Sequence, residues 1–239
     1  MSLLSHIQKQ KSQHRPMLAV LVDPSKPDAY EGLLPYLREV DMVFVGGSTG
    51  ETIDPCVDVL REHTKSPLIL FPGNVAQFSP RADALLFLSL LNARTADMLI
   101  TPHVQIAQKV LSSGIESIPM GYVLIDGARK SSVEMVSQCT PIPQDDLDYI
   151  VSTAVAGQLL GKQLIYLEAG SGAKKAVSTD IIRAVHEHLT VPLIVGGGIC
   201  TPQAMLDAFE AGADIVVIGN HFEQHPEELP IFIHALSTL

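Results

Sequence analysis

Three glycine-containing segments in the last third of the sequence have the residue types of a phosphate-binding site. They are residues 166–172 (YLEAGSG), residues 196–198 (GGG) and the pair Gly219 and Asn220, and each ends an apolar, β-like run just before a helical pattern. Glycine lets the backbone approach a ligand closely, and the first amides of the following helix offer unpaired donors to an anion. One such segment is ordinary turn chemistry, but three together predict a phosphate cup.

Glu168 lies beside these glycines and is a candidate catalytic base. A carboxylate next to a bound phosphate can accept a proton from a hydroxyl group on the same substrate. Tyr166, two residues earlier, points to the same face of its strand and can hydrogen-bond the same ligand. The alternative for Glu168 is a structural ion pair with Lys174 or Lys175 at the start of the next helix.

Asp23 and Ser48 follow the first two apolar runs and form a candidate pair of Mg²⁺ ligands. Mg²⁺ takes few protein ligands and completes its octahedron with water and phosphate oxygens. Aspartate and serine also commonly cap turns, so the residue types leave that structural role open for both. Lys26 likewise has two interpretations, as a phosphate ligand or as a solvent-facing side chain.

Eight short apolar runs, separated for the most part by helical patterns, would position these residues. The runs are MLAVLVDP, MVFVGGS, PLILFPG, ALLFLSLLN, MGYVLIDG, QLIYLEAG, PLIVGGG and DIVVIGN. Alternating strands and helices predict parallel strands buried on both faces, and eight of them predict an α/β fold of the TIM (β/α)8-barrel type. The chain of 239 residues agrees with one barrel domain, residues 1–239, because this fold takes about 250 residues. Helices are predicted over residues 28–40, 51–64, 96–113, 144–161, 178–189 and 202–211.

Two connections depart from this alternation. Only residues 74–83 separate the third and fourth runs, fewer than the dozen or more that a helical crossover takes, so an extended connector is predicted in place of the third helix. Residues 127–143 are long and polar, and they predict a loop over one end of the barrel. Histidines within helical patterns, such as His103, are expected at the surface.

Composition disfavours several classes of function. The net charge of -10 disfavours nucleic acid and anionic membrane surfaces as partners. The three cysteines are far apart in sequence, which predicts a reduced, cytoplasmic protein without a zinc site or a disulfide framework. The longest uncharged apolar segment, residues 84–93, is about half of the ~20 residues that span a bilayer, and residues 1–16 lack a signal-peptide core. Neither a membrane span nor export is expected.

The motifs resemble those of the geranylgeranylglyceryl phosphate synthase family, within a wider group of prenyltransferases that includes the bacterial PcrB-like proteins. The motifs are DPSK, VGGST, LFPGN, FLSLLN, YLEAGSGA, VGGGI and IGN, and the resemblance covers essentially the whole chain. YLEAGSGA with the two later glycine sites is specific to this family, whereas VGGGI and IGN alone occur in many phosphate-binding barrels. The resemblance implies a modified TIM barrel that lacks its third helix.

The resemblance also implies roles for individual residues. Asp23 and Ser48 become Mg²⁺ ligands, Glu168 accepts the proton of the attacking hydroxyl, and Tyr166 assists at the same site. Lys26 is a further candidate for substrate binding. The glycerol phosphate site is formed by Tyr166, Leu167, Glu168, Ala169, Gly170, Ser171, Gly172, Gly197, Gly198, Gly219 and Asn220.

The reaction implied by the resemblance joins sn-glycerol 1-phosphate to a prenyl diphosphate through an ether bond and releases diphosphate. Mg²⁺ would neutralise the diphosphate while an allylic, carbocation-like centre develops at the prenyl C1 atom. Residues 127–143 resemble the longer-loop branch of the family, which favours geranylgeranyl diphosphate as donor over heptaprenyl diphosphate. Family members are dimers or hexamers, so a homo-oligomer is expected.

Several alternatives stay open from the sequence. Apolar residues 86–91 and 120–125, with the short connector, are candidates to line a prenyl trough, or they are ordinary barrel core. Another phosphate-binding barrel enzyme, such as a sugar-phosphate isomerase or an FMN-dependent oxidoreductase, is a second class of function, and a non-catalytic prenyl or phospholipid carrier is a third. The presence of both Asp23 and Glu168 argues against a carrier, because a binder needs neither a metal ligand nor a base.

Overall fold

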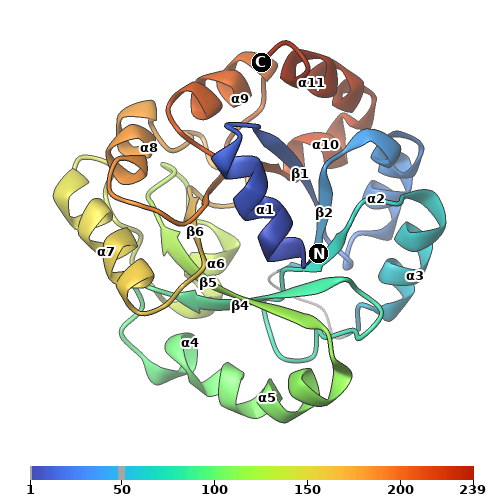
Figure 1. Cartoon of the computed structure of the whole chain (residues 1–239), viewed down its shortest axis with the longest axis horizontal. Helices are drawn as coiled ribbons and strands as arrows, with labels where there is room; N and C mark the ends of the chain where they lie inside the picture. Colours follow the sequence, from blue (N-terminus) through green and yellow to red (C-terminus); the bar gives the residue numbers. More distant parts are fainter. Residues whose placement is uncertain (1, 48–51) are drawn as a thin grey trace.

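A closed barrel of eight parallel strands forms the centre of the molecule (Figure 1). The computed structural model describes residues 2–47 and 52–239. Each strand pairs with the next, and Met17 of the first lies opposite Ile215 of the last, which closes the sheet. The predicted barrel is confirmed with all eight strands, which are β1 (Met17–Val22), β2 (Met42–Val45), β3 (Leu68–Leu70), β4 (Ala84–Leu90), β5 (Glu116–Leu124), β6 (Leu164–Glu168), β7 (Leu193–Gly196) and β8 (Ile215–Ile218).

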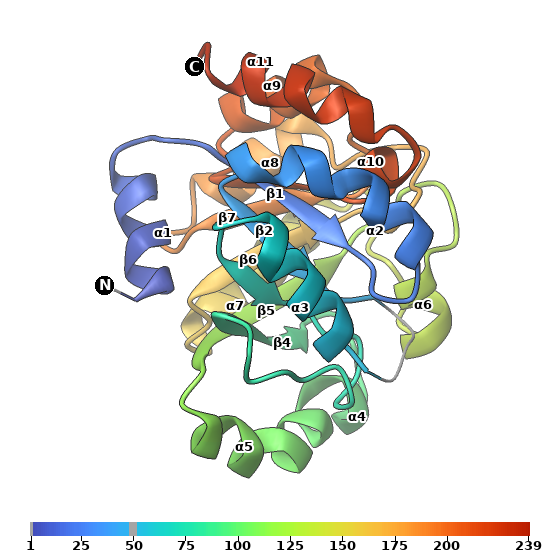
Figure 2. The same cartoon turned by 90° about the vertical axis from the view of Figure 1, so that its right-hand side faces the viewer.

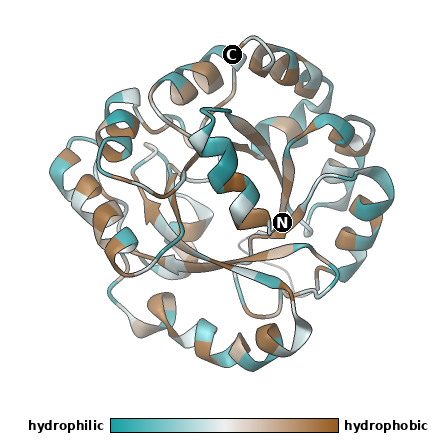
Figure 3. Cartoon of the chain, viewed as in Figure 1, coloured by the Kyte–Doolittle hydropathy of each residue, from teal (hydrophilic) through white to brown (hydrophobic). Residues whose placement is uncertain are grey.

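Strand residues alternate between the barrel interior and the surrounding helices. In β1, Met17 and Ala19 belong to the interior cluster together with Phe44 of β2, whereas Leu18 and Val20 belong to the cluster that packs under the helices. Figure 3 shows the apolar character of the strands and the more polar outer faces of the helices. Burial on both faces explains why these strands are near-continuous apolar runs in the sequence.

Helices of the outer layer follow the predicted pattern with two local changes. The helix predicted over residues 28–40 continues as a 3₁₀ turn, and the one over 96–113 breaks at Ile100, two residues before Pro102, which cannot donate a backbone hydrogen bond. Ser178 and Thr201 cap their helices through side-chain oxygens, as their types predict. The helices are α2 (Pro27–Leu33), η1 (Leu34–Glu39), α3 (Asp54–His63), α4 (Ala96–Leu99), α5 (Thr101–Ser113), α7 (Leu147–Leu159), α8 (Thr179–His186) and α9 (Pro202–Glu210).

The connection between β3 and β4 contains no helix, as predicted. The buried side chain of Gln77 holds this connector in place. Its Oε1 atom accepts hydrogen bonds from the backbone N–H of Gly73 at 2.9 Å and of Gly47 at 3.4 Å. A buried amide with these partners fixes the extended connector against the loop after β2.

The segment predicted as a loop over residues 127–143 contains a helix, α6 (Ser132–Ser137), so that prediction was wrong in part. Ser131 is its N-cap, and the Ser131 side chain accepts a hydrogen bond from the backbone N–H of Glu134 at 3.1 Å. Serine followed three residues later by glutamate is the sequence signature of a capping box, and it was the available signal for this helix.

A helix that the sequence analysis did not predict, α1 (Leu3–Ser12), covers the end of the barrel where the strands begin (Figures 1 and 2). Its Ile7 side chain is buried in the barrel interior cluster. Backbone N–H groups of Leu3 and Leu4 donate to the Glu116 carboxylate at 2.6 and 2.9 Å. Figure 2 shows α6 on the opposite side of the molecule, so the carboxyl ends of the strands face away from α1.

Three further elements after β8 were also not predicted. They are α10 (Asn220–Gln224), η2 (Pro226–Glu228) and α11 (Leu229–Leu236), and they complete the outer layer next to α2 and α9. Throughout the described residues, the helices are too short or too polar to cross a membrane.

Candidate active site

A cavity of about 500 Å³ lies at the carboxyl ends of the strands. One end is formed by glycines of the loops after β6, β7 and β8, and the other is an apolar arm between β4 and α5. Asp23, Tyr166 and Glu168 also line the cavity, so a phosphate-type end and an apolar end share one chamber with the two predicted carboxylates. The arm is lined mainly by Leu86, Phe87, Leu88, Leu90, Met98 and Ile106.

The glycines of the cup are required by backbone geometry and by space. Gly172, Gly197 and Gly198 have φ angles of +68°, +83° and +75°, which side-chain-bearing residues rarely adopt. A Cβ atom on Gly197 would collide with the Oε1 atom of Glu168, and one on Gly198 would lie 3.1 Å from the backbone nitrogen of Ala176. These positions therefore bring bare backbone to the edge of the cavity.

Two side-chain contacts join the loops of the cup. The Ser171 hydroxyl donates to the Asn220 Oδ1 atom at 2.8 Å, which links the loop after β6 to the start of α10. Arg129 donates through Nη1 to the Gly172 carbonyl oxygen at 3.3 Å. Arg129 was not predicted, because its only signal in the sequence is a basic pair, Arg129 and Lys130, inside a segment interpreted as a loop.

Glu168 is a buried carboxylate, with 7% of its surface exposed. Burial raises its pKa, while hydrogen bonds from the Tyr166 hydroxyl and the Gly170 backbone N–H act in the opposite direction. The Gly170 N–H lies 2.7 Å from the Glu168 Oε1 atom. Within the described part of the chain no lysine or arginine pairs with Glu168, so the alternative ion pair with Lys174 or Lys175 is not formed. A carboxyl group with a raised pKa is a stronger base once ionised.

An aromatic floor made of Phe44, Phe71, Tyr122 and Tyr166 fills the barrel interior beneath Glu168. The Tyr122 and Tyr166 rings are 5.3 Å apart and both lie within 6.1 Å of the Phe71 ring. Burial and the charge of Glu168 raise the pKa of Tyr166, so its hydroxyl stays protonated and donates to Glu168. Tyr166 was predicted in the site and Tyr122 within the candidate trough segment 120–125, whereas Phe71 was not singled out.

Asp23 has the turn-capping role that the sequence left open, and its position also leaves room for the other. Its Oδ1 atom accepts from the backbone N–H and the hydroxyl of Ser25, at 3.0 and 2.7 Å, which is a turn cap. The same side chain lines the cavity, with its Oδ2 atom 3.6 Å from the Lys26 ammonium. Ser48 lies outside the described residues. A carboxylate on the wall of an open chamber fits Mg²⁺, because water and phosphate oxygens could complete the coordination there.

Lys26 lines the cavity, as the prediction of substrate binding requires, but it is already paired. Its Nζ atom lies 2.7 Å from the Glu223 Oε2 atom, and Glu223 belongs to α10. Glu223 was not predicted as a site residue, because α10 was not predicted.

Several predicted residues lie away from the cavity. Leu167 and Ala169 are buried in the cluster under the helices, and Gly170 contributes its N–H group to Glu168. His103, expected at the surface, is 8% exposed, and that expectation was wrong. Its ring contacts Phe87 edge-on at 4.4 Å between centroids and lines the apolar arm, where burial lowers its pKa and favours the neutral ring.

Comparison with known proteins gives one consistent result. The sequence profile of the PcrB family matches residues 9–235. A geranylgeranylglyceryl phosphate synthase of Zunongwangia profunda is 46% identical over 92% of this chain and 97% of its own length. The corresponding protein of Korarchaeum cryptofilum is 37% identical over 93% of both chains. The crystal structure of (S)-3-O-geranylgeranylglyceryl phosphate synthase from Thermoplasma acidophilum, in complex with substrate sn-glycerol-1-phosphate, is 31% identical with a TM-score of 0.91 over 100% of both chains.

We expect Gly197→Ala to weaken glycerol phosphate binding by about 10-fold or more, because a Cβ atom there displaces Glu168 and the backbone of the cup. Gly114→Ala is the matched control: its φ angle of +72° causes similar backbone strain, but no atom lies within 4 Å of the added Cβ. Calorimetric titration with sn-glycerol 1-phosphate measures both. Equal losses in the two variants would show that strain, rather than the cup, is responsible.

Proposed function

The chain belongs to the PcrB family, among the geranylgeranylglyceryl phosphate synthases, and on that basis we propose that its cavity joins sn-glycerol 1-phosphate to geranylgeranyl diphosphate. The products are 3-O-geranylgeranyl-sn-glycerol 1-phosphate and diphosphate. The observation that carries the proposal is the single chamber that connects the glycine cup to an apolar arm, with Glu168 and Asp23 lining it.

The glycine cup supports the proposal for the acceptor. Its loops after β6, β7 and β8 lie next to Glu168, so a phosphate held there places the rest of a short glycerol backbone beside that carboxylate. In the proposed step, the glycerol hydroxyl oxygen forms a bond to the prenyl C1 atom as the bond from C1 to diphosphate breaks. The hydroxyl proton passes to Glu168, whose carboxylate Tyr166 and Gly170 keep oriented.

The apolar arm supports the proposal for the donor. Its side chains come from β4, α4 and α5, and the helix-free connector after β3 adds Pro72 and Val75 to the wall. Of the predicted trough residues, Leu86, Phe87, Leu88, Leu90 and Tyr122 line the cavity. Met120, Val123, Leu124 and Ile125 are core, and Leu91 packs against it. An apolar arm that opens into a polar chamber suits a long hydrocarbon with a charged head group. The relatives named above support geranylgeranyl over a longer donor.

Mg²⁺ is the cofactor we propose, with Asp23 as a ligand. When bound, the ion supplies positive charge to the diphosphate leaving group. Lys26 adds a second cation near the same carboxylate.

We further propose a homo-oligomer that works in the cytoplasm. The free thiols Cys56, Cys139 and Cys200 suit a reducing compartment.

Product formation tests the proposed reaction. Purified protein is incubated with Mg²⁺, geranylgeranyl diphosphate and either sn-glycerol 1-phosphate or its 3-phosphate enantiomer, and the extracted ether lipid is detected by mass spectrometry. We expect product from the 1-phosphate and little from the enantiomer. A parallel reaction with heptaprenyl diphosphate measures donor preference. Folded protein that forms no product with either donor would overturn the proposal.

Glu168→Gln should reduce turnover by about 10²- to 10⁴-fold, the usual contribution of a general base, with little change in glycerol phosphate affinity. The activity of the wild type should decrease as the pH is lowered, because Glu168 becomes protonated. This loss should begin at a higher pH than it would for an ordinary glutamate, because the pKa of Glu168 is raised. Glu187→Gln, at an exposed position after α8, is the control.

Thermal melting separates this effect from misfolding. The pKa of Glu168 is higher in the folded protein than in the unfolded chain. Glu168 therefore contributes stability below its unfolded-state pKa, and this contribution is lost as the pH rises through its folded-state pKa. At pH 8 the Gln variant should therefore melt no lower than the wild type. Turnover close to the wild-type value would remove Glu168 from the mechanism.

Asp23→Asn should lower Mg²⁺-dependent activity by about 100-fold while the fold and glycerol phosphate binding persist, since Asp23 is proposed to serve the diphosphate. Asp97→Asn changes a second carboxylate on the cavity wall and is the matched control. Activity is measured across a Mg²⁺ titration. If both variants respond to Mg²⁺ as the wild type does, the metal is held elsewhere.

A further inference from the structure

Four metal-ligating side chains gather in the segment after β8. His221 and His225 are four residues apart across α10, and Glu227 and Glu228 follow in η2. The backbone N–H of His225 donates to the His221 carbonyl at 2.9 Å, and that of Glu228 donates to the His225 carbonyl at 3.1 Å. One helical turn therefore places both imidazoles on one side, and the next turn folds the glutamates back toward them.

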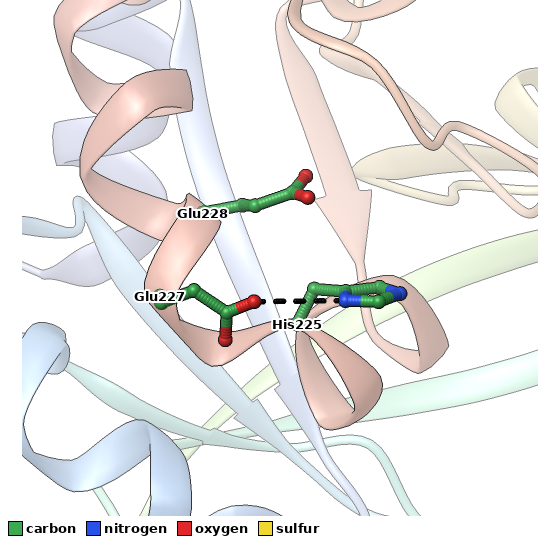
Figure 4. A group of neighbouring side chains, drawn as sticks. All are labelled: His225, Glu227 and Glu228. Atoms are coloured by element: carbon green, nitrogen blue, oxygen red, sulfur yellow. Dashed lines mark ion pairs between the residues drawn. The ribbon is translucent and has the colours of Figure 1, made fainter.

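Figure 4 shows three of these residues, His225, Glu227 and Glu228, whose ligand atoms lie close together. One nitrogen of His225 and one carboxylate oxygen each of Glu227 and Glu228 all lie within 4.8 Å of one another. His225 Nδ1 lies 3.6 Å from Glu227 Oε1, and His221 Nε2 lies 2.8 Å from Glu228 Oε2. The two imidazole rings are 5.4 Å apart. His221 joins this group of three through its contact with Glu228 and through its ring, which lies next to that of His225.

We propose that His221, His225, Glu227 and Glu228 bind a divalent transition-metal ion of the Zn²⁺ or Co²⁺ class. Two imidazole nitrogens and two carboxylate oxygens are a donor set typical of four-coordinate zinc, with bonds of about 2.0–2.2 Å. Mg²⁺ prefers oxygen ligands and near-ideal octahedral geometry, so this cluster and Asp23 select different ions.

The charge of the cluster favours a cation. In the described part of the chain, the only ion-pair partners of Glu227 and Glu228 are the two histidines, and neither glutamate pairs with lysine or arginine. When the imidazoles are neutral, the cluster carries two negative charges without a fixed positive partner.

One ligand of the site is held in place before the ion arrives. The His221 side chain is 11% exposed and its ring packs against Phe222 and Phe232, at 5.6 and 5.4 Å between centroids. His225 and Glu227 are exposed and free to adjust. His221 directly follows Asn220 of the glycine cup, so the site adjoins the cavity. The proposal does not depend on the transferase reaction.

Metal binding by untagged protein in Mg²⁺-free buffer tests the site. The Cys200→Ser variant is the parent for every measurement, because the exposed Cys200 thiol is another possible zinc ligand. Co²⁺ is titrated while its visible absorption is recorded, and Zn²⁺ affinity is measured by competition with a chromophoric chelator. We expect one ion per chain with the absorption of a low-coordinate nitrogen and oxygen site.

His225→Gln and Glu227→Gln should each weaken Zn²⁺ binding by about 10-fold or more, because each removes one of four ligands. His188→Gln is the matched control, since His188 is an exposed histidine after α8 whose Nδ1 atom bonds to the Ala184 carbonyl. It should bind like the parent. Metal-free melting temperatures close to that of the parent show that the folds are equivalent.

Two outcomes would overturn the proposal. Absence of stoichiometric Zn²⁺ binding would show that the histidines and glutamates only form ion pairs that fasten α10 to η2. Equal affinity in the parent and in His225→Gln would place the ion elsewhere. Both results are independent of prenyl transfer, which is measured separately.

Discussion

The buried carboxylate of Glu168 is the constraint on which the arrangement of the site depends. Burial disfavours its charge, so the surrounding chain must supply donors, and Tyr166 and Gly170 do so. The carboxylate also needs space on the side of β7, where a Cβ atom on Gly196 or Gly197 would collide with Glu168 or the Tyr166 hydroxyl. These glycines therefore leave room for the Glu168 carboxylate, and in the proposed reaction they would also present backbone to the phosphate beside it.

The two ends of the barrel differ because of the segments that connect the strands and precede the first of them. At one end, α1 buries Ile7 in the barrel interior and is tied to the start of β5 through Glu116. At the other end, no helix follows β3, and the connector held by Gln77 forms part of the cavity wall. Side chains of β4 and α5 are thereby left to line an apolar arm instead of packing under a third helix.

The strands and the helix-free connector were predictable because both follow from local sequence patterns. The strands follow from the apolar runs, and the connector follows from the small number of residues, 74–83, between two of these runs. The cup was predictable because its glycines end strands of a known direction. Contacts between distant segments were not predictable, as with Arg129 at Gly172 or Glu223 at Lys26. Leu167 and Ala169 were assigned to the site as neighbours of Glu168, yet alternation along β6 turns them toward the helices. His103 shows the same limit, since a polar residue in a helical pattern gives no sign that Phe87 covers it.

Charge in the cavity gives an independent argument for a cation in the proposed reaction. The described charged residues on the wall are Asp23, Asp97, Glu168 and Glu223 against Lys26, and Lys26 is already paired with Glu223. A diphosphate that enters this chamber meets more negative than positive charge, and in a partly apolar enclosure such repulsion is screened less than in water. Lys26 alone cannot balance both the diphosphate and Glu223. A divalent ion on Asp23 would convert the nearest carboxylate from a repulsive group into part of the diphosphate site.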